Sequence, residues 1–69
     1  MSKIKIILNG EDYLVQENCS VSDLIKELDL DINKIAIERN LEIVLVEDFF
    51  KTTINSGDKI EIVSFIGGG

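Results

Sequence analysis

The chain has 69 residues, of which 45% are hydrophobic and 29% are charged. This composition is typical of one globular domain, near the size at which a single core is just sufficient. With 13 acidic and 7 basic residues the net charge is −6, which argues against a nucleic-acid or anionic-membrane binder and suits a basic protein partner. The apolar stretches are shorter than the roughly 20 residues of a membrane span. No signal-peptide core precedes Asn9-Gly10, so we expect a cytoplasmic protein.

The N-terminal segment predicts a β-hairpin. Polar and apolar residues alternate at the start of Lys3–Leu8, as in a half-buried strand. Asn9-Gly10 follows, and both residue types tolerate the positive φ of a two-residue hairpin turn. Glu11–Glu17 is the expected second strand, with Tyr13 and Val15 on one face.

The hydrophobic period then changes to that of a helix. One apolar stripe with i, i+3, i+4, i+7 spacing is made by Val21, Leu24, Ile25 and Leu28. Ser20 and Asp23 fit a capping box in which Asp replaces Glu, and an acidic residue there also favours the positive end of the helix dipole. We expect a helix from about Val21 to Leu28 or Asp29.

Two short strands should follow the helix. They are expected at Ile35–Arg39 and Ile43–Val46, joined by a turn at Asn40-Leu41 in which leucine is poorly suited to positive φ. We expect 47–53 to be irregular or a single helical turn. Phe49-Phe50 should pin this segment onto the core.

Ser56-Gly57-Asp58 is a turn, and the last strand begins at Lys59. The order is then hairpin, helix, two short strands, last strand. A helix between strand pairs can cover one face of a mixed sheet, and the isoleucine-rich first and last strands are the expected central parallel pair. The pattern predicts an α+β protein of the β-grasp, or ubiquitin-like, fold, with four to five strands and one main helix on one face.

The last strand has two unlike faces. One face is expected to fill the core and takes Ile60, Ile62, Ser64 and Ile66; the other takes Lys59, Glu61, Val63 and Phe65. The second face begins charged and becomes apolar towards the C-terminus, so Val63 and Phe65 are candidates for docking a partner. The alternative for Phe65 is packing against a neighbouring strand.

Three glycines, Gly67, Gly68 and Gly69, end the sequence. A backbone without side chains can enter a channel too narrow for a Cβ atom and present its terminal carboxylate to a nucleotide. The alternative is a merely flexible end. We expect residues 1–66 to form the β-grasp domain and 67–69 a flexible tail.

The chain offers little chemistry of its own. A single cysteine, Cys19, excludes an internal disulfide and a cysteine-rich metal site, and there is no histidine to act as base or metal ligand. We therefore expect Cys19 to be a structural or incidental thiol. Neither a bound cofactor nor a metal is expected, and the domain should not be an enzyme.

The C-terminal half resembles the ThiS sulfur carriers of thiamine biosynthesis. The resemblance rests on Ile37-Glu38-Arg39-Asn40, on Glu42-Ile43-Val44 and above all on the final run from Gly57 to Gly69. Related molybdopterin carriers usually place prolines before the di-glycine, and this chain has none. It departs from the family at Leu41, where a small or polar residue is frequent, and at 44–47, where a Val-Pro-Arg-like stretch is frequent.

The resemblance implies a covalent carrier. A ThiF-like adenylating enzyme would use ATP to adenylate the Gly69 carboxylate. A sulfur donor such as a cysteine desulfurase would convert the adenylate into a thiocarboxylate. A thiazole synthase (ThiG-like) would then take the sulfur. Val63, Phe65 and Ile66 are the residues beside the tail that are expected to supply binding energy to the partner.

Three other functions are compatible with a β-grasp fold and a glycine tail. A carrier for molybdopterin, cysteine or tRNA thiolation would use the same tail. A ubiquitin-like modifier would end in an isopeptide bond to a lysine. A non-covalent interaction module would not need its tail at all.

Overall fold

The computed structural model describes residues 2–65. Within them the elements follow the predicted order. The strands are β1 (Lys3–Leu8), β2 (Glu11–Gln16), β3 (Ile35–Arg39), β4 (Glu42–Val44) and β5 (Lys59–Ser64); the helix is α1 (Val21–Glu27), and two 3-10 turns are η1 (Ile32–Lys34) and η2 (Val46–Asp48).

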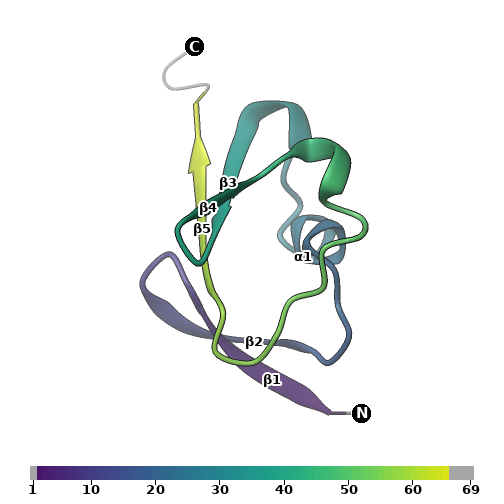
Figure 1. Ribbon diagram of the computed structural model, residues 1–69, viewed down its shortest axis with the longest axis vertical. Helices are drawn as coiled ribbons and strands as arrows, with labels where there is room; N and C mark the ends of the chain where they lie inside the picture. Colours follow the sequence, from purple (N-terminus) through teal and green to yellow (C-terminus); the bar gives the residue numbers. More distant parts are fainter. Residues whose placement is uncertain (1, 66–69) are drawn as a thin grey trace.

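The strands form one mixed sheet in the order β2-β1-β5-β3-β4 (Figure 1). β1 and β5 are the central parallel pair, and the other neighbours are antiparallel. The helix α1 packs on one face of this sheet. The predicted α+β architecture, a β-grasp fold with one helix, is confirmed.

Both hairpin turns contain two residues with positive φ. The angles are 50° at Asn9 and 84° at Gly10 in the first, and 53° at Asn40 and 72° at Leu41 in the second. Paired positive φ values match the right-handed twist of the flanking strands. Leu41 is strained by this conformation, because its Cβ approaches the following carbonyl oxygen.

The start of α1 has the predicted capping box. The Asp23 backbone N–H donates to Ser20 Oγ (3.1 Å), and the Ser20 backbone N–H donates to Asp23 Oδ2 (2.9 Å). The hydrogen bonds from Ser20 hold the pKa of the Asp23 carboxyl below its ordinary value. The helix ends at Glu27 with Leu28 as its C-cap, slightly before the predicted end at Leu28 or Asp29.

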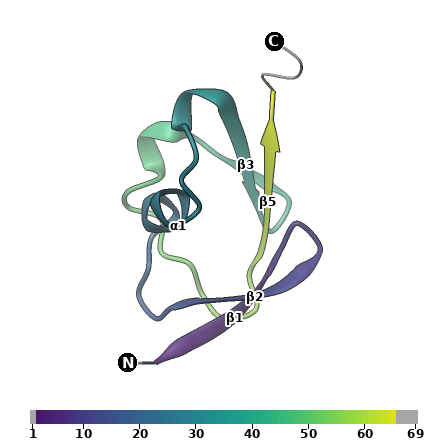
Figure 2. The same ribbon diagram turned by 180° about the vertical axis from the view of Figure 1, so that it is seen from behind.

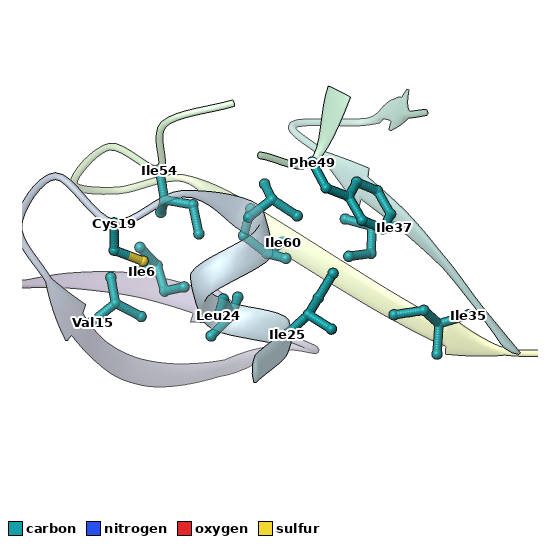
Figure 3. Packing of buried hydrophobic residues seen from close by; sticks show 11 residues of the cluster. Ile6, Val15, Cys19, Leu24, Ile25, Ile35, Ile37, Phe49, Ile54 and Ile60 are labelled. Carbon is teal, nitrogen blue, oxygen red and sulfur yellow. The ribbon is translucent and has the colours of Figure 1, made fainter. Parts of the chain in front are cut away.

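The core lies between α1 and the sheet (Figure 3). Its buried side chains come from α1, from four of the five strands and from the segments before α1 and between η2 and β5: Ile6, Val15, Cys19, Val21, Leu24, Ile25, Ile35, Ile37, Phe49, Ile54 and Ile60. Five of these residues are isoleucine or valine in strands, where branched side chains pack well: Ile6, Val15, Ile35, Ile37 and Ile60.

One prediction about the segment after β4 is wrong, and another holds only in part. The strand expected over Ile43–Val46 covers Glu42–Val44, because the chain turns into η2, where the Asp48 N–H donates to the Leu45 carbonyl (2.8 Å). Phe49 is buried, but Phe50 is 73% exposed. Successive side chains of a helical turn point in different directions, so only one of the two phenylalanines can reach the core.

Candidate functional site

The candidate site is the C-terminal part of β5 and the face of the sheet beside it. β5 extends beyond β1 and β2 towards the C-terminus (Figure 2). Its alternation is as predicted: Ile60 is buried, and Ile62 packs partly buried against the core. On the other face Val63 is 60% exposed and Phe65 is 59% exposed.

Phe65 does not pack into a neighbouring strand. Its backbone N–H donates to the carbonyl of Lys34 (3.2 Å), the last residue of η1, just before β3. The structure therefore leaves the Val63 and Phe65 side chains accessible, and their docking role stays a prediction. Ile66, Gly67, Gly68 and Gly69 lie outside the described residues, and so does the predicted boundary between domain and tail.

The start of β5 is anchored by the Asp58 carboxylate, which is buried. Asp58 Oδ2 accepts from Arg39 Nε (2.8 Å) and from the Asn55 backbone N–H (2.8 Å), and Oδ1 accepts from Asn40 Nδ2 (3.0 Å). Burial works against the charge, but the hydrogen bonds from Asn55, Asn40 and Arg39 outweigh it, so the pKa of Asp58 lies below its ordinary value. This anchor joins the β3–β4 turn to the turn before β5.

The middle of β5 is held by an asparagine side chain. Asn9, in the β1–β2 turn, accepts the Ile62 N–H on its Oδ1 (2.8 Å), while its own N–H donates to the Ile60 carbonyl (2.9 Å). The side chain thus continues the parallel pairing for one more residue after β1 has turned away. From the sequence, Asn9 and Asp58 are predicted only as turn residues, and these hydrogen bonds are an additional finding of the structure. The Gly-Asp pair before β5 was the one signal that could have indicated the anchor.

Besides Asp23 and Asp58, the described residues with shifted pKa values are Cys19 and Tyr13. The Cys19 thiol is buried, and burial, with the nearby carboxylates of Asp23 and Glu27, raises its pKa. Tyr13 donates from its hydroxyl to Glu27 Oε2 (2.6 Å), which ties β2 to α1 and raises the pKa of the phenol. Residues 2–65 contain neither a cluster of three metal-binding side chains nor a helix long and apolar enough to cross a membrane.

A β-grasp domain whose last strand runs exposed and apolar towards a glycine-rich C-terminus belongs to the class of ubiquitin-like carrier proteins. Comparison with known proteins places the chain within this class. The ThiS family model matches residues 3–69, and the chain belongs to the ThiS family, the sulfur carriers of thiamine biosynthesis.

Relatives from two kinds of protein support this assignment. The sulfur carrier protein ThiS of Bacillus subtilis is 35% identical over 63 residues, which cover 90% of this chain and 96% of that protein. A thiazole synthase of Paramagnetospirillum magneticum is 46% identical over 66 residues, or 96% of this chain. The chain spans only 20% of the length of that thiazole synthase.

A solved structure agrees. The crystal structure of the thiamine biosynthesis protein ThiS from Geobacter metallireducens superimposes with a TM-score of 0.83 at 30% identity. The match covers 96% of this chain and 100% of that one. The fold and the family are therefore supported independently.

Proposed function

We propose that this chain carries sulfur as a thiocarboxylate on Gly69 and donates it to thiazole formation in thiamine biosynthesis. The observation that supports the proposal most is the exposed apolar end of β5 in a member of the ThiS family. This strand leads directly to Gly67-Gly68-Gly69 in the sequence.

The chemistry begins with activation of the tail. A ThiF-like enzyme binds ATP, and the Gly69 carboxylate attacks the α-phosphate. An acyl-adenylate forms and pyrophosphate leaves. A carboxylate is a poor acceptor for a sulfur nucleophile, and the adenylate supplies AMP as the leaving group.

Sulfur then replaces AMP. A persulfide from a donor such as a cysteine desulfurase attacks the acyl carbon and AMP leaves. A second thiol cleaves the remaining S–S bond, which leaves the thiocarboxylate on Gly69. A thiazole synthase takes this sulfur into the thiazole precursor.

The partner enzymes supply all catalytic groups, so the chain itself is a substrate and binds no cofactor. We expect these steps to take place in the cytoplasm. The chain has no histidine, and its one thiol is buried with a raised pKa.

Ordering three glycine residues costs about 3–6 kcal/mol of backbone entropy. Contacts with the folded domain must offset this cost, and the exposed side chains of Val63 and Phe65 are placed to make them.

The test is the intact mass of the chain after incubation with ATP, a ThiF-like enzyme and a sulfur donor. We expect a gain equal to replacing one oxygen by sulfur. A chain without Gly69 and a chain with one alanine appended after it are the matched controls, and neither should gain this mass. An unchanged mass with an enzyme that is active on another ThiS protein would refute the proposal, and so would full transfer by the extended chain.

A further inference from the structure

Two carboxylates lie side by side on the face of the sheet that α1 does not cover. Glu38 in β3 is directly opposite Glu61 in β5. The neighbouring rows of the register place Ile37 against Ile62 on the core side, so Glu38 and Glu61 point to the other face. Both residues are half-buried.

This pair is unfavourable for the isolated fold. Like charges directly opposite each other destabilise a sheet, and partial burial weakens the screening that water would provide. The ion pairs within residues 2–65 are Lys5–Asp12, Arg39–Asp58 and Lys51–Asp48. Glu38 and Glu61 therefore have no cationic partner in the described part of the chain.

Two cationic side chains lie close to this pair in the sequence, and neither forms an ion pair with Glu38 or Glu61 among the described residues. Arg39 follows Glu38, but its side chain donates to Asp58. Lys59 lies two residues before Glu61 on the same face of β5, yet it forms no ion pair with a carboxylate of the described residues. Within residues 2–65, no ion pair neutralises the Glu38–Glu61 pair.

Exposed apolar side chains surround the pair. Ile43 is directly opposite Glu38 on β4 and is 62% exposed. Val63 and Phe65 follow Glu61 along the same face of β5. We call this surface, made of Glu38, Ile43, Glu61, Val63 and Phe65, the acidic–apolar face. It is complementary to an apolar surface that presents one cation.

We propose that Glu38 and Glu61 together bind a basic side chain, an arginine, on the docking surface of the adenylating enzyme. The proposal rests on the proposed function, because the acidic–apolar face is the one that leads along β5 to the tail that this enzyme must hold. A guanidinium has several donors in one plane and can engage two adjacent carboxylates at once. Binding would replace the repulsion between Glu38 and Glu61 by two charge-assisted hydrogen bonds.

The test measures the affinity of the full chain for a purified ThiF-like enzyme by isothermal titration calorimetry. The variants are Glu38→Gln, Glu61→Gln and the double variant. Glu17→Gln removes the same charge from an exposed position just after β2 and is the matched control. The urea midpoint of each variant is measured as well.

We expect each of the two variants to weaken binding about tenfold, which corresponds to ~1.4 kcal/mol. The double variant should lose less than the product of the two effects, because both carboxylates contact one cation. Neither substitution should lower the urea midpoint, since each removes the repulsion. A purely structural role would lower the midpoint together with the affinity.

The proposal is overturned if Glu38→Gln and Glu61→Gln bind as Glu17→Gln does. It is also overturned if they weaken binding only to the thiazole synthase. The thiocarboxylate assay on the unaltered chain keeps these results separate from the proposed function. A wild-type chain that gains sulfur while the variants bind normally refutes the acidic pair alone.

Discussion

Replacing Asp58 by asparagine perturbs the anchor at the start of β5. The substitution keeps the size of the side chain and removes its charge. One oxygen can still accept from Arg39 Nε and the Asn55 N–H, as Oδ2 does in the structure. The new amide N–H₂ group then faces Asn40 Nδ2, so two donors oppose each other where Oδ1 accepted a hydrogen bond.

The expected loss of stability is about 2–3 kcal/mol. The hydrogen bond from Asn40 is lost outright, the one from the Asn55 N–H becomes neutral, and the one from Arg39 loses its ionised acceptor; each of the last two is worth roughly 1 kcal/mol less. The ion pair adds little beyond this, because the Arg39 side chain is still 30% exposed and water screens it. A domain of this size has only about 3–5 kcal/mol in total, so the variant should be close to half unfolded in mild denaturant.

The loss should depend on pH. Because the folded-state pKa of Asp58 lies below its value in the unfolded chain, the ionised carboxylate stabilises the fold fully above about pH 4. This contribution disappears as the pH falls through the folded-state pKa. The difference between wild type and Asp58→Asn should therefore be largest near neutral pH and should vanish in acid.

Urea unfolding followed by circular dichroism measures both effects. With a slope of roughly 1 kcal/mol per molar urea, the midpoint should fall by about 2–3 M at pH 7. Asp48→Asn is the control, since Asp48 pairs with Lys51 at the surface (3.2 Å) and should lose less than ~0.5 kcal/mol. A midpoint shift no larger than that of Asp48→Asn, or a shift that persists unchanged in acid, would refute the reasoning.

Three further predictions concern a turn, a cap and the exposed face. Leu41→Gly should raise the free energy of unfolding, measured in urea melts, by about 0.5–1 kcal/mol, because glycine adopts positive φ without strain. The same change at Leu45, which has φ −72°, should lower the free energy of unfolding. Equal effects of the two substitutions would contradict the strain at Leu41. Ser20→Ala should lower the free energy of unfolding by ~1 kcal/mol, because the helix loses its N-cap hydrogen bond. Ser22→Ala, inside α1, should lower it by less than ~0.5 kcal/mol. Similar thermal midpoints for the two variants would contradict the contribution of the cap. Phe65→Ala should weaken the affinity for the adenylating enzyme, measured by calorimetry, about tenfold. It should lower the free energy of unfolding by less than ~0.5 kcal/mol, because the Phe65 side chain is exposed. Parallel losses of affinity and stability would instead place Phe65 in the core.

Local sequence signals predicted the elements whose stability depends on neighbours in the chain. Asn9-Gly10 forms the expected turn, since its two residues can take positive φ without help from elsewhere. The apolar stripe that starts at Val21 forms the expected helix, with the reciprocal hydrogen bonds of Ser20 and Asp23. The alternation along β5 also predicted which face leaves Val63 exposed.

Local sequence signals did not predict where β4 ends or which of Phe49 and Phe50 is buried, because both alternatives fit the local pattern equally well. Ile43–Val46 is apolar enough for a strand, but the chain turns at Leu45 so that Phe49 can enter the core. Nothing in the sequence distinguishes Phe49 from Phe50, because both are aromatic and adjacent. The position of the segment relative to α1, set by the Ser22 N–H donating to the Phe49 carbonyl (3.0 Å), makes the distinction.

The sequence by itself determined the class of fold, the acidic character and the glycine-rich end, because periodicity, charge and glycine content are properties of neighbouring residues. Only the tertiary structure decided how distant groups meet. Asn9 reaches Ile62 across 53 positions, and Arg39 reaches Asp58 across 19. The register of β3 against β5 places Glu38 beside Glu61. A shift of one residue in that register would separate the two carboxylates without changing any local pattern, since strand pairing depends on the packing of the whole sheet against α1.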